Sequence, residues 1–341
     1  MTESSSHPYN KIVNDITSIG LDWHSETILE NSVFNSKKIN KSILDLNAPI
    51  DEKASSAIVI SAGPSLYKNN ILERIKSSGF KGSIIAIDGS YVRCLKAGLI
   101  PDYLLTLDPH PTRIVRWFGD PNLDKNTKND DYFLRQDLDI AFRDDTKLEN
   151  KKNIQLVDKY GKNQKLIICS TAPKNVVERV NNVGFDTYWW APLVDNPNDE
   201  KSLTREIVKK TNLPAMNTGG TVGTASWVFA HTALKIKHIA VVGMDLGYYK
   251  SDTSYEQTQT FYELKKQIGD NDLKQYFPET SYPGKDEVFF TDPTYGWYKN
   301  NFLSLIKASN SQVYNCSGGG TLSGSGINCI EIEQFCKLKK T

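Results

Sequence analysis

The sequence predicts an α/β fold in which a mainly parallel β-sheet is flanked by helices. Three observations support this prediction: short β-branched apolar runs, amphipathic stretches with helical spacing that follow them, and small-residue turns between the two. The run AIVIS (57–61) is typical of a strand that is buried on both faces. Because parallel strands need a crossover connection, usually a helix, this alternation indicates an open parallel sheet.

The alternation begins at Ala57, after which a helix is expected over 66–79. Its apolar residues recur at helical spacing, and Gly79 is a typical residue for the end of a helix. The remaining elements are expected in this order: strand 83–88, helix 91–100, strand 101–108, strand 165–170, helix 175–184, strand 186–194, helix 221–235, strand 238–246, helix 295–310 and a terminal strand 311–317.

Three polar stretches interrupt the pattern. Residues 1–54 carry no strong strand signal, and we interpret them as a helical N-terminal extension. Residues 119–153 hold few apolar anchors and are expected to form a surface insertion, while 247–296 are interpreted as a long loop region. These boundaries leave one α/β domain at about 55–330 and a C-terminal tail at 331–341.

Composition excludes several classes of protein. The 341 residues include 41 Lys and Arg and 40 Asp and Glu, a net charge of +1, which argues against bulk nucleic-acid binding. The five cysteines form no CxxC pair, so neither a disulfide framework nor a structural zinc site is expected. No stretch reaches the roughly 18 apolar residues of a membrane span. We therefore expect a soluble cytoplasmic protein; its oligomeric state is not legible from the sequence.

The turn SAGPSL (61–66) is the first candidate binding site. It lies between a predicted strand and helix, where Gly63, Pro64 and Ser65 would bring exposed backbone amides and the positive end of the helix dipole to an anion. It is neither a GxGxxG fingerprint nor a Walker loop. The alternative is a plain strand-to-helix turn.

The segment NTGGTVGTA (217–225) is the second candidate, because it precedes an apolar helix and is rich in Gly and Thr. We expect it to line one nucleotide pocket together with the first turn. Its candidate contacts are Asn217, Thr218, Gly219, Gly220 and Thr221. Bulk at Gly219 is expected to abolish nucleotide binding and to leave the fold intact. A third run, GGGTLSGSG (318–326), is either a flexible loop or a functional one.

Acidic residues close three predicted strands, at the edge where open α/β sheets bind ligands. Asp88 is expected either to meet a nucleotide or to cap a helix, and Asp245 to contact ligand or metal. In TLDPHPTR (106–113), Asp108 or His110 is the candidate base, held by stiff prolines, and the alternative is a solvated turn. A role for Mg²⁺ stays open; Asp108 and Asp245 would be its ligands.

Four segments, SAGPSL, PDYLLTLD, NTGGTVGTA and VVGMDLGYY, together resemble the MptE-like family, which includes the motility accessory factor (Maf) glycosyltransferases. The resemblance spans about 55–330 with gaps. The first and third segments also resemble the GNGPSL turn and the later cradle of bacterial sialyltransferases, which bind a CMP-sugar at the carboxyl edge of a Rossmann-like sheet. Ala62 stands where those enzymes have Asn, so the resemblance leaves the donor open.

The resemblance implies two activities. One transfers a nonulosonic acid from its CMP-sugar to a protein hydroxyl; the other is the Mg-ATP-dependent 6-hydroxymethyl-7,8-dihydropterin diphosphokinase. TLDPHP (106–111) and GGTVGTA (219–225) lack acids that the pterin-type motifs contain. TDPTYGWYKNNF (291–302) and YNCSGGGTLSG (314–324) resemble the closing segment of the Maf type.

The favoured expectation is therefore a nucleotide-sugar-dependent glycosyltransferase, with a CMP-activated acidic sugar as donor and a glycan or protein hydroxyl as acceptor. Such an enzyme need only bind the phosphate of the donor, orient the acceptor and remove one proton. A pterin diphosphokinase that uses ATP is the alternative. A third class is a nucleotide-binding module without catalysis.

Overall fold

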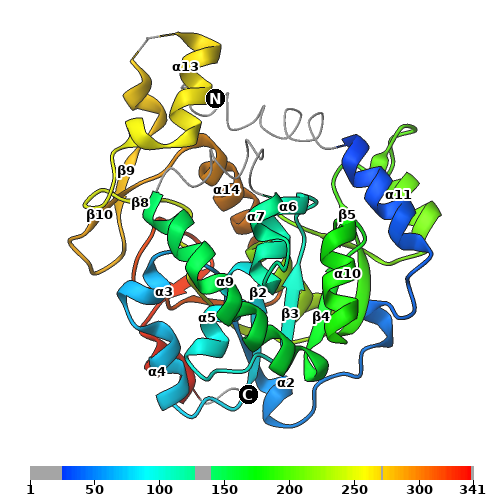
Figure 1. Cartoon of the computed structure of the whole chain (residues 1–341). Helices are drawn as coiled ribbons and strands as arrows, with labels where there is room; N and C mark the ends of the chain where they lie inside the picture. Colours follow the sequence, from blue (N-terminus) through cyan, green and yellow to red (C-terminus); the bar gives the residue numbers. More distant parts are fainter. Residues whose placement is uncertain (1–24, 127–139, 270–271, 339–341) are drawn as a thin grey trace.

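The computed structural model describes residues 25–126, 140–269 and 272–338 (Figure 1). Within them, nine parallel strands form one sheet in the order β12-β11-β7-β1-β2-β3-β4-β5-β6. Their bounds are β1 Ser56–Ile60, β2 Ser83–Ile87, β3 Tyr103–Thr106, β4 Lys165–Cys169, β5 Asp186–Leu193, β6 Ala215–Asn217, β7 His238–Val242, β11 Gln312–Asn315 and β12 Ile327–Cys329. The predicted parallel α/β sheet is confirmed.

Helices surround this sheet. They are a helix over residues 25–36, η1 Ile43–Asp45, α2 Glu52–Ser55, α3 Ser65–Lys68, α4 Ile71–Ser77, α5 Asp88–Lys96, α6 Pro111–Val115, η2 Arg116–Phe118, α7 Leu123–Asn126, α9 Ile140–Tyr160, η3 Gly161–Asn163, α10 Lys174–Val183, α11 Leu203–Thr211, α12 Val222–Val228, η4 Phe229–Ala233, η5 Tyr255–Gln257, α13 Gln259–Ile268, η6 Leu273–Tyr276, α14 Pro293–Lys307 and α15 Ile332–Lys337. Among the described residues, no helix combines the length and the apolar character that a membrane crossing requires.

The strand order reverses next to β1. From β1 the chain adds strands in one direction as far as β6, and it then returns to place β7 on the other side of β1. Ile58 of β1 therefore pairs with Ile84 of β2 and with Ala240 of β7. In open α/β sheets, ligands bind outside the carboxyl ends of the strands at such a reversal. The β1–β7 boundary is this position here.

Both faces of the sheet are covered. In β1, Ile58 and Ile60 belong to the core on the α4, α5 and α10 side, whereas Ala57 and Val59 belong to the core on the α12 and α14 side. Burial on both faces favours apolar residues at successive positions of the strand, as residues 57–60 are.

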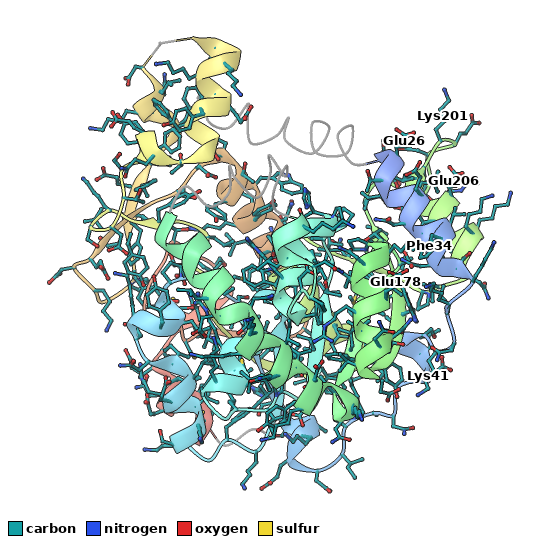
Figure 2. The ribbon with its side chains drawn as sticks, viewed as in Figure 1. Glu26, Phe34, Lys41, Glu178, Lys201 and Glu206 are labelled. Carbon is teal, nitrogen blue, oxygen red and sulfur yellow. The ribbon has the colours of Figure 1, made fainter. Side chains whose placement is uncertain are left out.

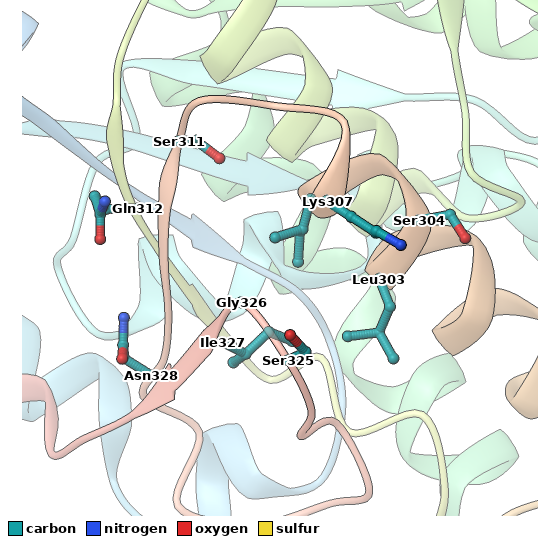
Figure 3. Close-up of a pocket in the computed structure, with 10 residues that line it drawn as sticks. Leu303, Ser304, Lys307, Ser311, Gln312, Ser325, Gly326, Ile327 and Asn328 are labelled. Atoms are coloured by element: carbon teal, nitrogen blue, oxygen red, sulfur yellow. The ribbon is translucent and has the colours of Figure 1, made fainter.

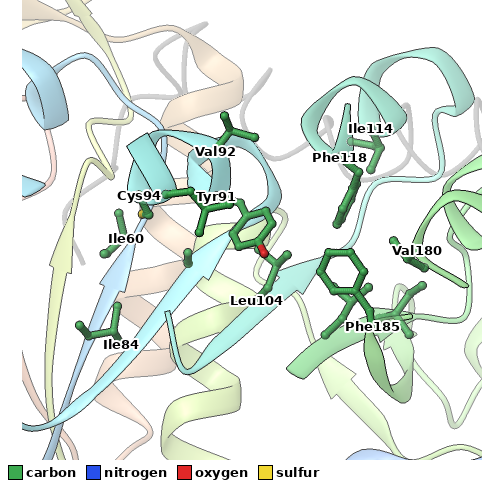
Figure 4. Close-up of a cluster of buried hydrophobic side chains, with 14 of the residues drawn as sticks. Ile60, Ile84, Tyr91, Val92, Cys94, Leu104, Ile114, Phe118, Val180 and Phe185 are labelled. Atoms are coloured by element: carbon green, nitrogen blue, oxygen red, sulfur yellow. The ribbon is translucent and has the colours of Figure 1, made fainter. Parts of the chain in front are cut away.

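Aromatic rings fill the core on the α5 and α10 side (Figure 4). The ring of Phe185 lies 6.1 Å from that of Tyr91 and 5.8 Å from that of Phe118, between centroids. All three side chains are buried, and burial of one large apolar side chain contributes about 1.5–3 kcal/mol. This packing fixes α5 against the strands that lead to the ligand edge.

Several expected boundaries differ in the structure. The helix expected over 66–79 is two helices, α3 and α4, because Asn70 adopts a left-handed conformation with φ 50°. Of the insertion expected at 119–153, residues 127–139 lie outside the described residues. Residues 140–153 belong to the long helix α9 and not to a loop, which corrects the prediction there.

The stretch 247–296 is not one long loop, so that prediction is wrong. It contains the antiparallel strands β8 (Tyr248–Tyr249), β9 (Glu279–Ser281) and β10 (Val288–Phe290), together with α13. Stacked rings hold this part together, as in the pair of Tyr248 and Phe290 with centroids 5.0 Å apart. Strands of two or three residues are too short for alternation to reveal them.

The two ends of the described chain also pack on the domain. Helix 25–36 lies beside α10 (Figure 2), and Lys174 Nζ stands 5.6 Å from the ring centroid of Phe34. The strand at 312–315 is not terminal as expected, because β12 and α15 follow it. Phe335 of α15 is fully buried in the main core, and Arg74 of α4 pairs with Glu333.

Candidate functional site

Two turns meet at the reversal of the sheet, and we call them the switch turns: residues 61–65 after β1 and residues 243–245 after β7. Ser61 N–H donates to Val242 O and Gly63 N–H donates to Gly243 O, each at 2.8 Å. These bonds continue the β1–β7 ladder past the ends of the strands. The first predicted binding turn therefore lies at the expected edge of the sheet.

Gly63 is needed for this contact between the turns. A Cβ atom at this position would lie 2.6 Å from Gly243 O and 2.7 Å from Asp245 Cγ, which is closer than atoms approach. The sequence analysis assigned the glycine to a phosphate. The structure shows a second reason for a glycine at this position: the turns after β1 and β7 approach each other too closely for a side chain. Pro64 follows and precedes α3, half-buried.

Asp245 binds the start of α3. Ser65 N–H donates to Asp245 Oδ2 at 2.8 Å, and the hydroxyl of Ser65 donates to Oδ1. Only 3% of Asp245 is exposed, and this burial raises the pKa of its carboxyl group, although the bonds from Ser65 act in the opposite direction. The carboxylate thus takes the place that an external anion would occupy at this helix start.

The second predicted loop is held by its own side chains. Asn217 Oδ1 accepts from Gly219 N–H at 2.8 Å, and Thr218 Oγ1 accepts from Gly220 N–H at 3.2 Å. Thr221 is the N-cap of α12, since its Oγ1 accepts from Thr224 N–H at 3.0 Å. These side-chain hydrogen bonds therefore hold the loop in one conformation where it enters the first turn of α12.

The expectation that bulk at Gly219 leaves the fold intact is wrong. Gly219 has φ 55° and Gly220 has φ 91°, a region that favours glycine. A Cβ on Gly219 would lie 2.3 Å from Thr224 Cγ2, and one on Gly220 would lie 2.4 Å from Trp297 Cζ3. A side chain at either position would strain the loop itself.

Ser61 brings the two loops together. A Cβ on Gly223, in the first turn of α12, would lie 2.7 Å from Ser61 Oγ. Ser61 is 6% exposed, and its hydroxyl has no hydrogen-bond partner among the described residues. Both loops therefore reach the same edge, although a single pocket lined by all the predicted contacts stays a prediction. The sequence analysis did not name Ser61 as a site residue; its place directly after β1 was the available signal.

Asp88 links the ends of β2 and β3. Its Oδ2 accepts from Thr106 Oγ1 and its Oδ1 accepts from Gly89 N–H, both at 2.7 Å. Asp88 is the first residue of α5 and is 4% exposed. Its carboxylate turns toward its own helix and toward β3, and a nucleotide contact stays a prediction.

Residues 107–111, the loop after β3 and the first residue of α6, carry the candidate base. Asp108 Oδ1 accepts from His110 N–H at 2.8 Å, and His110 Nδ1 lies 3.2 Å from Thr112 Oγ1. Both side chains are half-buried at the carboxyl edge of the sheet. An imidazole that is oriented through Nδ1 can exchange a proton at Nε2 near neutral pH.

Asp108 and Asp245 are the two candidate metal ligands. Within the described residues, no three His, Cys, Asp or Glu side chains lie together as a metal would need. Both oxygens of Asp245 accept hydrogen bonds from Ser65. A role for Mg²⁺ stays a prediction, and we route no step through one.

The glycine-rich run 318–326 packs against the switch turns. Thr321 N–H donates to Asp245 O at 2.7 Å, and Lys299 Nζ of α14 donates to Thr321 O at 2.6 Å. A Cβ on Gly320 would lie 2.5 Å from Asp245 Cα. The run therefore supports the backbone of Asp245.

A cavity of about 420 Å³ lies at the other edge of the sheet (Figure 3). It is formed by α14 and by the first residues of β11 and β12, including Lys307, Gln312 and Asn328. These are the amino ends of the strands, so the cavity is separate from the candidate site.

Comparisons with known proteins agree with the resemblance seen in the sequence. Residues 26–122 match the family model described as 6-hydroxymethylpterin diphosphokinase MptE-like. A protein of Treponema pallidum (strain Nichols), described only as uncharacterized, is 38% identical over 55 residues, which are 16% of this chain and 25% of that protein. The MptE-like resemblance is thus confirmed, and its matched part includes the turn after β1.

The fold is shared with a solved structure, that of the Maf glycosyltransferase from Magnetospirillum magneticum AMB-1. The TM-score is 0.54 at 15% sequence identity, over 93% of this chain and 39% of that one. The matches cover 25% of the Treponema protein and 39% of the Maf glycosyltransferase, less than half of either relative. At this identity the likeness concerns the fold.

Proposed function

We propose that this chain, with its MptE-like segment and the fold of a Maf glycosyltransferase, is a nucleotide-sugar-dependent glycosyltransferase. The observation that carries the proposal is the hydroxyl of Ser61, buried without a described partner where the β1 turn meets the first turn of α12. A phosphate oxygen at this point would accept from that hydroxyl and meet the positive end of the helix. The donor we favour is a CMP-activated acidic sugar.

The chemistry needs little from the protein beyond placement. The bond between the anomeric carbon and the phosphate oxygen breaks, and its electron pair leaves with the nucleotide. The acceptor oxygen forms the new bond to that carbon, and its proton passes to His110 or Asp108. One oriented base and one phosphate cradle suffice for this transfer.

A pterin diphosphokinase is the second candidate, favoured by the description of the family that residues 26–122 match. That reaction transfers a diphosphate from Mg-ATP, and it relies on metal ions and cations around the phosphates. The described residues offer no clustered acids for such a metal. We therefore rank it below sugar transfer.

The decisive test is a product assay. The full chain is incubated with CMP-N-acetylneuraminic or CMP-pseudaminic acid and a panel of hydroxyl acceptors, and in parallel with Mg-ATP and 6-hydroxymethyl-7,8-dihydropterin. Mass spectrometry then identifies the products. A glycosylated acceptor with release of CMP supports the proposal, whereas a pterin diphosphate contradicts it. Binding of a nucleotide that raises Tm without turnover would assign a non-catalytic module.

A further inference from the structure

The backbone of the loop 107–111 is held at three alternate carbonyl groups, each by a side chain from another element. Thr171 Oγ1, after β4, donates to Leu107 O at 2.9 Å. Asn175 Nδ2, in the first turn of α10, donates to Pro111 O at 2.8 Å. Between them, Asn31 Nδ2 of helix 25–36 reaches Pro109 O at 3.4 Å. We call this segment the clamped loop.

The sequence of the clamped loop explains why it needs such support. Pro109 and Pro111 have no N–H group, so this stretch cannot continue the sheet ladder beyond β3. Its carbonyl groups still need donors where water is partly excluded, as at the half-buried Leu107 and Pro109. Side-chain amides and a hydroxyl supply these donors from outside the loop.

The N-terminal helix is itself firmly attached to the turn after β4. Asn31 Nδ2 also donates to Thr171 O at 2.9 Å, so that one amide group joins two of the clamped segments. Asn35 Nδ2 donates to Ser170 O at 2.8 Å and to Ala172 O at 2.7 Å, with no part of Asn35 exposed. Helix 25–36 is therefore bound to the carboxyl edge of the sheet and is part of the domain.

We infer that Asn31, Thr171 and Asn175 are positioning residues that hold the clamped loop so that Asp108 and His110 keep one orientation at the ligand edge. The catalytic role of that orientation rests on the proposed function, whereas the three hydrogen bonds of the clamp are observed in the chain itself. It gives helix 25–36 a role in the candidate site. None of the three residues needs to touch a substrate.

Hydrogen exchange of the full chain tests the clamp without any substrate. The variants are Asn31→Ala, Thr171→Val and Asn175→Ala, and peptides covering 106–114 are followed by mass spectrometry. Loss of one hydrogen bond corresponds to roughly fivefold faster exchange. Asn182→Ala is the matched control, because Asn182 is an exposed asparagine on the same helix as Asn175. It should leave these peptides unchanged.

The same variants separate positioning from a purely structural role. In the transfer assay, kcat should fall roughly tenfold to a hundredfold in Asn175→Ala while KM for the donor stays within about twofold. Unchanged exchange at 106–114 in Asn175→Ala, whose half-buried side chain lies outside the hydrophobic core, would overturn the inference, as would altered KM alone. Faster exchange in the variants, together with no sugar transfer by the wild-type chain, would support the clamp and reject the proposed function.

Discussion

The switch turns and the clamped loop lie on the same edge of one sheet, and each carries an acid two or three residues after a strand. In the switch turns, Asp245 is 3% exposed and both its oxygens accept from Ser65. In the clamped loop, Asp108 is half-buried and binds the backbone of His110. The first acid holds two parts of the chain together, while the second lies beside a titratable side chain.

The difference follows from what the chain does after each strand. After β7 it lies against the turn of β1, so that Asp245 is enclosed and becomes a cap for α3. After β3 the two prolines, which lack N–H groups, end the sheet ladder and Pro111 begins α6, and the side chains of the acid and the histidine stay half-buried at the edge. A strand-end acid is therefore a candidate for catalysis only where the following segment leaves it accessible.

The largest effect is expected in the clamped loop. His110→Ala should lower kcat by about 10²–10⁴-fold with donor affinity retained, since a positioned base contributes that much. Steady-state kinetics and calorimetry measure the two quantities separately, and Asp108→Asn is tested in the same way. His231→Ala, on η4 at the far end of α12, is the control and should change kcat by less than about twofold. Unchanged turnover in both loop variants would remove the loop from the mechanism.

In the switch turns, the large effect is expected on the free energy of unfolding. Gly63→Ala places a Cβ 2.6 Å from Gly243 O, and overpacking against backbone should cost about 2–3 kcal/mol in urea unfolding. The matched change is Gly89→Ala after β2, where the nearest atom is Ala62 Cβ at 3.3 Å. It should stay within about 0.5 kcal/mol of wild type. Equal losses at both positions would contradict the close contact of the switch turns.

A smaller and pH-dependent effect is expected for Asp245→Asn. Burial raises the pKa of Asp245 in the folded state, so its contribution to stability is complete below the unfolded pKa and is lost as pH rises through the folded pKa. The variant should cost about 1–2 kcal/mol near pH 4, and the difference from wild type should shrink as pH rises. Urea unfolding across pH 4–8 measures this. Asp108→Asn should stay within about 0.5 kcal/mol; a difference that grows with pH would refute the buried role of Asp245.

The sequence predicted the centre of the sheet well, because residues 57–60 and 239–242 are apolar on both faces of their strands and leave little choice of structure. It also placed both loops and all three acids at the correct edge. It could not rank the acids, since the partner of Asp245 is Ser65, 180 residues away in the chain. Nor could it place helix 25–36, which adds only Ile28 and Leu29 to the main core and is otherwise held by polar bonds to backbone carbonyls that give no hydrophobic period.

The most direct test of the proposed donor site compares two serines at the same edge. Ser61→Ala removes a buried hydroxyl without a described partner, so unfolding stability should not fall, whereas affinity for a CMP-activated acidic sugar should drop about tenfold. Ser90→Ala removes a hydroxyl that donates to Ile60 O at 2.8 Å; it should cost about 1 kcal/mol of stability and leave affinity unchanged. Calorimetric titration together with urea unfolding gives both quantities. Equal donor affinity in wild type and Ser61→Ala, or no donor binding to wild type, would contradict the account.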